Sequence, residues 1–161
     1  MSGSDGRAGA AAVAEAEARL LRAIQPAGWK RPKGYANGML GEGRLLFVAG
    51  QIGWDEAERF PSDRFADQWD RALANVLAVV RAAGGGPEHI ARMTVYVVDK
   101  REYLDQLEEV GAAWRRHMGR HYPAMALVQV AALLEDRARV EIEATAVLPA
   151  EPSVGRGGRG A

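Results

Sequence analysis

The segment 122–147, YPAMALVQVAALLEDRARVEIEATAV, constrains the fold more than any other stretch of the chain. In its second half, apolar residues occupy every second position from Val140 to Ala146. This period of two is typical of a strand with one face in a core. The first half alternates in the same way. Because no Asn-Gly turn lies between the halves, we predict a hairpin of two strands joined by a loop of several residues.

Two glutamates, Glu141 and Glu143, interrupt the apolar character of the second strand. Glutamate is a poor strand former, so such carboxylates face water, pair with cations or line a site. On one strand face their side chains lie about 7 Å apart, near the spacing of acid/base pairs. Alternatively, one carboxylate pairs with an arginine such as Arg92 or Arg139 while the other is solvated. The pattern alone leaves both interpretations open.

The rest of the chain predicts two helices, at 63–83 and 101–118, and further strands at 35–53 and 89–98. Segment 35–53 reads as another hairpin, so the element order is ββαβαββ. We therefore predict an α+β fold with a six-stranded mixed sheet and both helices packed on one face. The other face would then be bare, which usually indicates an interface. The residues predicted on that bare face are Tyr96, Val98, Met125, Leu127 and Val147.

The domain itself is predicted at 35–149. Residues 1–34 are expected to form a flexible N-terminal extension with a short Ala-rich helix at 10–24, and 150–161 a disordered tail rich in Gly and Arg.

Composition removes several classes of function. The 21 Lys+Arg balance the 21 Asp+Glu, so nucleic acid is an unlikely partner. The chain has no cysteine, which excludes thiolate catalysis and Cys-ligated metals. No apolar run approaches the roughly 18 residues of a membrane span, and the N-terminus lacks the features of a secretory signal. We therefore expect a cytoplasmic protein that contacts no membrane.

The segment WRRHMGRHYP gathers arginines around His117 and His121. Their spacing of four could place two metal ligands on one helix face, but no third ligand is nearby, so no metal is expected. The segment is either a solvated basic edge at a helix C-terminus or an anion site.

Several stretches resemble the RidA family, also called YjgF or endoribonuclease L-PSP. They are GYANG, VAGQIG, the Gln68…Ala74-Asn75-Val76 helix leading to AAGGG, MTVYVVD, YPA and VEIEATAV. The resemblance spans about 35–148. It implies a chorismate-mutase-like fold and a homotrimer with three clefts between subunits. It also implies imine/enamine deaminase activity on small metabolites without any cofactor.

The resemblance also implies the site. Glu141 corresponds to the glutamate that positions the attacking water, and Tyr35 to a tyrosine of the cleft. Gly50 and Gln51 match the SGQ motif, and we add Trp54 and Leu127 as substrate-binding candidates. The arginine that grips the substrate carboxylate is replaced here by Met125.

That replacement sets the functional hypotheses. Losing a guanidinium–carboxylate contact costs about 1.5–3 kcal/mol, so the cleft looks unsuited to 2-aminoacrylate-like substrates. We predict an imine/enamine hydrolase that acts on another small, more apolar metabolite. One alternative is a trimeric module that binds a small molecule without catalysis. Another is the translation inhibition or endoribonuclease activity that the older family names suggest.

Overall fold

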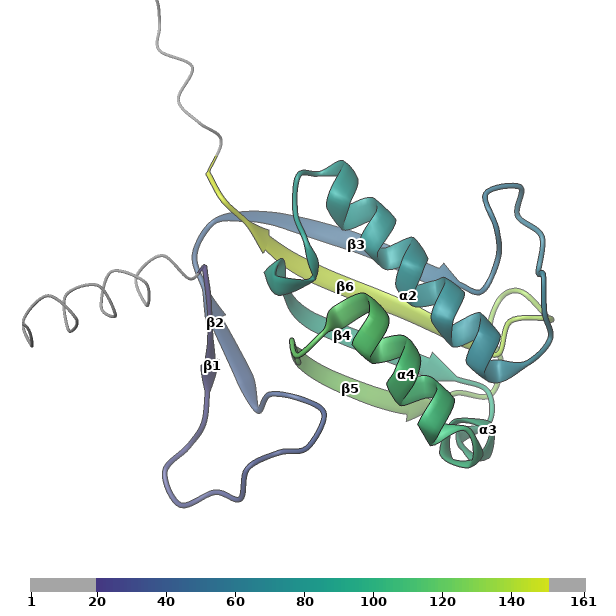
Figure 1. The fold of residues 1–161 in the computed structure, drawn as a ribbon, viewed down its shortest axis with the longest axis horizontal. Helices are drawn as coiled ribbons and strands as arrows, with labels where there is room; N and C mark the ends of the chain where they lie inside the picture. Colours follow the sequence, from purple (N-terminus) through teal and green to yellow (C-terminus); the bar gives the residue numbers. More distant parts are fainter. Residues whose placement is uncertain (1–19, 151–161) are drawn as a thin grey trace, which may run out of the picture.

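The computed structural model describes residues 20–150. The chain forms a four-stranded sheet, a separate two-stranded ribbon and a helical layer (Figure 1). The strands are β1 Leu21–Ile24, β2 Gly38–Gly41, β3 Arg44–Ile52, β4 Ile90–Val97, β5 Ala124–Gln129 and β6 Val140–Leu148. The helices are α2 Phe65–Ala82, α3 Lys100–Asp105 and α4 Leu107–Met118, and a short 3-10 turn η1 covers Pro87–His89.

Helix α2 is the element that the sequence predicts best. Its apolar stripe is fully buried, and the members of that stripe are Phe65, Trp69, Leu73, Val76 and Val80. The helix ends where Gly84 adopts a φ of 84°, a conformation that residues with a Cβ rarely accept. Ser62 lies just before the helix, where its hydroxyl accepts a hydrogen bond from the N–H of Arg64, the N-cap residue.

The predicted second helix is divided in two at Gln106. The Gln106 side chain accepts a hydrogen bond from the N–H of Ala66 at the start of α2, so this break ties the two helical segments together. Val110 and Trp114 face the core, whereas Leu107 is exposed.

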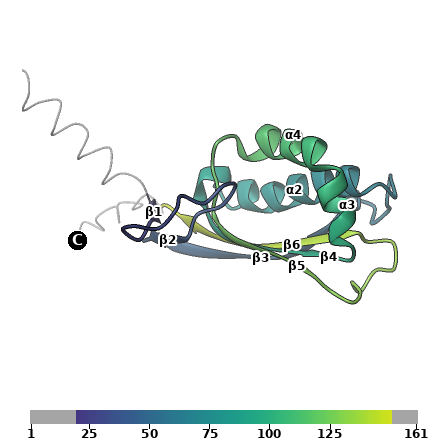
Figure 2. The same cartoon turned by 90° about the horizontal axis from the view of Figure 1, so that it is seen from below.

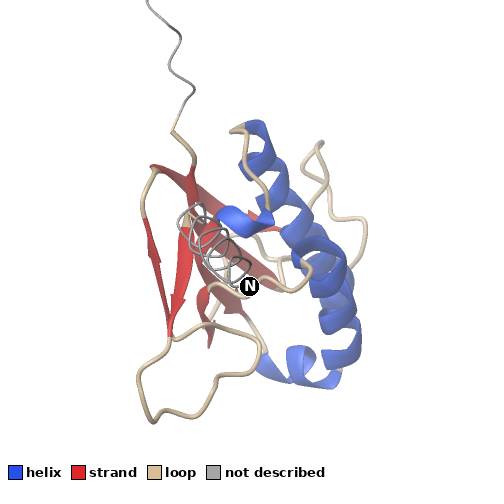
Figure 3. Ribbon diagram, turned by 60° about the vertical axis from the view of Figure 1, so that its left-hand side comes forward, coloured by secondary structure: helices blue, strands red, loops and turns tan. Residues whose placement is uncertain are grey.

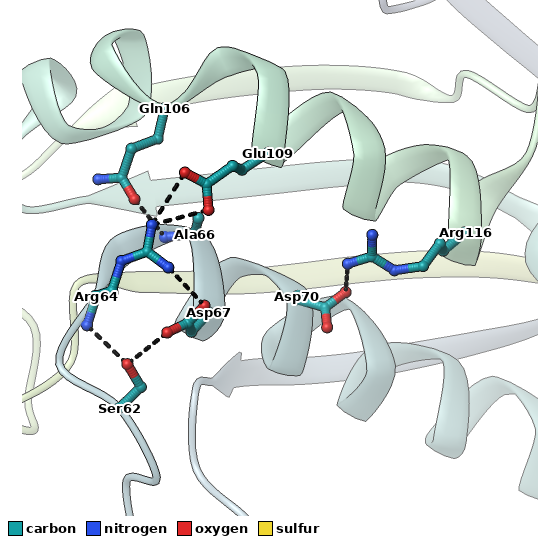
Figure 4. A network of polar contacts seen from close by, with 8 residues as sticks. All are labelled: Ser62, Arg64, Ala66, Asp67, Asp70, Gln106, Glu109 and Arg116. Atoms are coloured by element: carbon teal, nitrogen blue, oxygen red, sulfur yellow. Dashed lines mark hydrogen bonds and ion pairs between the residues drawn. The ribbon is translucent and has the colours of Figure 1, made fainter.

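Polar contacts also hold α2 against α4 (Figure 4). Arg64 donates to both oxygens of Glu109, at 3.0 and 2.8 Å. Further along α2, Asp70 lies 2.9 Å from the Arg116 guanidinium and 2.8 Å from the His117 ring. Burial raises the pKa of Asp70, but the hydrogen bonds from Arg116 and His117 outweigh it and leave that pKa below its ordinary value.

The mixed sheet has the strand order β3-β6-β4-β5, with only β4 and β5 parallel. This order contradicts both predicted hairpins. Strand β4 lies between β5 and β6, and β2 pairs with β1 instead of β3. The strands of each predicted hairpin are adjacent in sequence but not paired, because β2 pairs with the preceding strand β1, β3 pairs with β6, and β5 and β6 each pair with β4.

The six-stranded sheet is likewise replaced by one of four strands and one of two. Leu21–Ile24, the end of the predicted Ala-rich helix, forms β1, where these residues pair with β2. The ribbon stands apart from the helical layer (Figure 3). The rest of the predicted N-terminal helix and the predicted tail from 151 onward lie outside the described residues.

Helices α2, α3 and α4 lie on one face of the four-stranded sheet, as predicted for the helical layer, and within residues 20–150 the opposite face is bare of helices (Figure 2). The members of the bare face differ in part from those expected. In the parallel register Met125 pairs with Met93 and Leu127 with Val95, and both β4 partners are fully buried under the helices. Met125 and Leu127 therefore pack against the core.

Val147 is also buried, since it lies against the backbone positions of Gly41 and Gly43. The register nevertheless places Val147 beside Leu45, and Tyr96 beside Val128, so both share the bare face as predicted. The exposed apolar residues of that face are Leu45, Phe47 and Val128, while Tyr96 is half-buried. Among residues 20–150, no helix is long and apolar enough to cross a membrane.

Candidate functional site

Glu141 lies at one end of the sheet, where β6 begins and β3 ends. Its backbone pairs with Ile52 on one side and with Tyr96 on the other. A register shift between Val48 and Gln51 brings the Gly50 backbone against the Glu141 carboxylate, so closely that a Cβ at position 50 would collide with it. The glycine therefore makes room for the acid, and two of the predicted site residues, Gly50 and Glu141, lie in contact.

The two glutamates of β6 have different surroundings. Glu143 lies 3.9 Å from Arg92, while Arg139 pairs with Glu102 at 3.3 Å. In the described part of the chain, Glu141 has no ion pair. Glu143 is thus the glutamate that lies beside an arginine, as one of the two interpretations of the sequence predicts.

The loop after β3 holds the other predicted residues of this end. The Asn75 side chain donates hydrogen bonds of 3.0 Å to the carbonyls of Ile52 and Trp54. These bonds fix the backbone on either side of Gly53. The Gln51 side chain bonds back to the Ala49 carbonyl at 3.2 Å, and both Gln51 and Trp54 are half-buried. Asn75 therefore positions this loop from helix α2.

Tyr35 lies elsewhere, in a cleft of about 910 Å³ between the β1–β2 ribbon and the main domain. The segment between β1 and β2 is held next to Tyr35 because the Ala36 N–H donates to the Pro123 carbonyl at 2.9 Å. Polar and charged side chains line much of the cleft, and they are Gln25, Arg31, Asn37, Glu88, His89, Arg120 and His121.

Within one chain the Tyr35 cleft and Glu141 are at opposite ends of the sheet. The cleft residue His121 bonds to the Ile90 carbonyl at the start of β4, whereas Glu141 pairs with Tyr96 near its end. Six residues of strand separate these positions by roughly 20 Å. Met125 and Leu127, on the helical side, belong to neither place, so a single chain does not assemble the whole predicted site.

The histidines of the basic segment serve different contacts. His117 turns to Asp70, and the Nε2–H of His121 donates to Ile90. In residues 20–150, no three His, Asp or Glu side chains are grouped to hold a metal ion. Sequence reasoning missed Arg31 and His89 as cleft residues, because both come from loops without a motif. The basic segment itself was the available signal for Arg120 and His121.

Known proteins share this arrangement of elements. The family model described as Endoribonuclease L-PSP matches residues 29–148. The 2-iminobutanoate/2-iminopropanoate deaminase of Homo sapiens is 30% identical over 105 residues, which are 65% of this chain and 73% of that protein.

Two solved structures extend the likeness. The Rid-family protein YyfB of Yersinia pestis, of unknown function, has a TM-score of 0.71 and 28% identity, covering 80% of this chain and 99% of that one. Escherichia coli TdcF, solved with bound serine, has a TM-score of 0.58 and 34% identity over 81% and 94% of the two chains. These likenesses define the class as a Rid-type mixed α+β protein. The chain belongs to the endoribonuclease L-PSP family, also known as the RidA or YjgF family.

Proposed function

We propose that this protein is an imine/enamine hydrolase that acts on a small metabolite other than 2-aminoacrylate, without a cofactor. The observation that carries the proposal is the contact between Gly50 and the Glu141 carboxylate. Among the described residues the Glu141 carboxylate has no ion pair, and the backbone beside it, at Gly50, carries no side chain. The names of the relatives, 2-iminobutanoate/2-iminopropanoate deaminase and putative reactive intermediate deaminase, support the same reaction class.

The reaction needs a water molecule that attacks the imine carbon. Glu141 accepts a hydrogen bond from that water and takes its proton as the carbon–oxygen bond forms. Glu141 passes that proton to the imine nitrogen, which gives a tetrahedral adduct with one hydroxyl and one amino group. The hydroxyl proton then moves to the amino nitrogen as the carbon–nitrogen bond breaks, and the products are a carbonyl compound and ammonia. An enamine first tautomerises to the imine. In the proposed site Tyr35 and the backbone at Gly50 polarise the electrophile.

Assembly would unite the two ends of the sheet. In the proposed homotrimer the bare sheet faces meet, and the Glu141 end of one chain adjoins the Tyr35 cleft of its neighbour. The exposed Leu45, Phe47 and Val128 support burial of this face. Gln51 and Trp54 would line the cleft beside Glu141. Met125 and Leu127 would act from beneath β5 by shaping the cleft wall.

The test compares two matched variants, Glu141→Ala and Glu143→Ala, on a panel of imines generated by amino-acid oxidases. Both residues lie on the same face of β6, but Glu143 is paired with Arg92. We expect Glu141→Ala to lower kcat about 100-fold or more, the usual scale of a lost general base, and Glu143→Ala to retain turnover.

Gly50→Ala should lower turnover as Glu141→Ala does. It should keep a thermal stability close to that of wild type, because the displaced carboxylate is the end of a flexible side chain. Equal turnover by wild type and Glu141→Ala would refute the role of Glu141. A wild-type protein that binds imines without consuming any would favour the non-catalytic binding module.

A further inference from the structure

We infer that the Tyr35 cleft is an anion site, in which Arg31 and Arg120 bind the carboxylate or phosphate group of an amphipathic metabolite. The inference deepens the proposed function and rests on it only for the idea that the bound molecule is the substrate. It assigns the charge recognition that position 125 lacks to two arginines from other parts of the chain.

The charges of the cleft are unbalanced. Its acidic residue is Glu88, against the guanidinium groups of Arg31 and Arg120. Within residues 20–150, neither guanidinium is in an ion pair. By contrast, Arg116, which belongs to the same basic segment as Arg120, is paired with Asp70 on helix α2. Two arginines without protein partners in one concave site are suited to an oxyanion, which a guanidinium binds with paired hydrogen bonds.

The backbone defines the protonation pattern of the two cleft histidines. Nδ1 of His89 accepts the Gly86 N–H at 2.9 Å, so neutral His89 carries its proton on Nε2 and can donate it. The Glu88 carboxylate also approaches this Nδ1, at 3.4 Å, but the shorter bond from Gly86 determines the tautomer. Nε2 of His121 lies 2.7 Å from the Ile90 carbonyl and must donate, which leaves Nδ1 as an acceptor.

These groups describe a complementary ligand. His89 adds a donor to the two guanidinium groups, and His121 supplies an acceptor for an N–H or O–H of the ligand. Much of the remaining wall is apolar and includes Leu21, Ile24, Met39, Pro32 and Pro149. The volume of the cleft, about 910 Å³, is at the upper end for small-molecule sites and far exceeds the volume of a three-carbon acid. The expected ligand has an anionic head and an apolar body of aromatic size.

The test measures the binding of model ligands to the full chain. The probes are 3-phenylpropionate, its neutral amide 3-phenylpropionamide, and phenyl phosphate, which separates a phosphate head from a carboxylate head. The chain contains three histidines, so imidazole ¹H–¹⁵N spectra resolve each ring. His117, held by Asp70 outside the cleft, is an internal reference. The variants are Arg31→Gln, Arg120→Gln and the control Arg115→Gln, an exposed arginine near the end of α4.

We expect at least one anionic probe to shift the signals of His89 and His121 but not of His117, and the amide to bind at least about tenfold more weakly. Each cleft variant should raise Kd about tenfold, while Arg115→Gln leaves it unchanged. Raising NaCl from about 50 to about 500 mM should weaken anion binding only.

Equal binding of acid and amide, unchanged Kd in the cleft variants, or no binding of any probe would overturn the inference. The inference and the proposed function fail separately. Loss of turnover in Glu141→Ala without anion binding leaves only the function, and anion binding without any turnover leaves only the site.

Discussion

The two faces of the four-stranded sheet carry alternate residues of the same strands, yet only one of them is completed within the chain. On the covered face, Leu73 of α2 and Ile142 of β6 are fully buried. On the bare face, Leu45 and Phe47 of β3 are 61% and 74% exposed. Alternation along the strands thus builds a buried core on one side and leaves apolar side chains exposed on the other, a surface that usually indicates an interface.

The polar groups of the bare face lead to the same conclusion. Arg92 and Glu143 form a loose pair across β4 and β6, at 3.9 Å. Beside them Thr94 is 7% exposed, and its hydroxyl has no hydrogen-bond partner in the described part of the chain. A buried hydroxyl without a partner is uncommon in a finished structure. Among the described residues the covered face also has such an atom, the indole Nε1 of buried Trp69, but its helices are joined at the rim by paired charges such as Arg64 and Glu109.

The largest difference between the faces should appear when the same truncation is made on each. Leu73→Ala leaves a cavity under α2, and we expect it to lower the free energy of unfolding by about 3 kcal/mol. Leu45→Ala should lower it by less than about 0.5 kcal/mol in dilute solution, where chains are separate. Urea denaturation followed by tryptophan fluorescence measures both.

Protein concentration sharpens this comparison. If the bare face is buried between chains, the cost of Leu45→Ala should grow with concentration, while that of Leu73→Ala keeps its value. Similar costs for both variants in dilute solution would show that Leu45 is already buried within the single chain, and the contrast between the faces would be lost.

A charge on the bare face should change the assembly. We expect Phe47→Lys to convert the proposed trimer into monomers, because a desolvated ammonium in an apolar interface costs several kcal/mol. Leu134→Lys is the matched control: Leu134 is 94% exposed in the loop between β5 and β6, and this change should leave the mass unaltered. Light scattering coupled to size-exclusion chromatography gives the mass, and a trimeric Phe47→Lys would rule out this face as the interface.

Patterns within single segments predicted the main helices and strands of this fold well. They could not predict the strand order, because it depends on long-range pairing. The α2 stripe and the alternation of β6 are as predicted, because each depends on periodicity alone. Both hairpins are wrong because strand order depends on partners far away in sequence. For Met125 the alternation was recognised but its face was reversed, since only the register with Met93 determines which side of β5 is covered.

The candidate site divides in the same way. The Gly50 and Glu141 pair could be predicted because two family motifs meet there. Arg31 and His89 could not, because they come from loops whose positions in the cleft depend on how the ribbon packs. Arg120 and His121 belong to a segment for which an anion site was one of two interpretations, and the sequence alone offered no reason to prefer it.

The smallest predicted effect concerns the rim of the covered face. Because the pKa of Asp70 is lower in the folded chain than its ordinary value of 3.8, its contribution to stability is present above about pH 4 and is lost as pH falls through the folded pKa. Asp70 is 39% exposed, so solvent limits this contribution to less than about 1 kcal/mol. The stability advantage of wild type over Asp70→Asn should therefore disappear between about pH 5 and about pH 2, as urea denaturation can measure. Arg116→Gln should reduce that advantage. An advantage that persists at the acid end would mean that Asp70 acts through packing instead of charge, and that its pair with Arg116 adds no electrostatic stability at the rim of the helical layer.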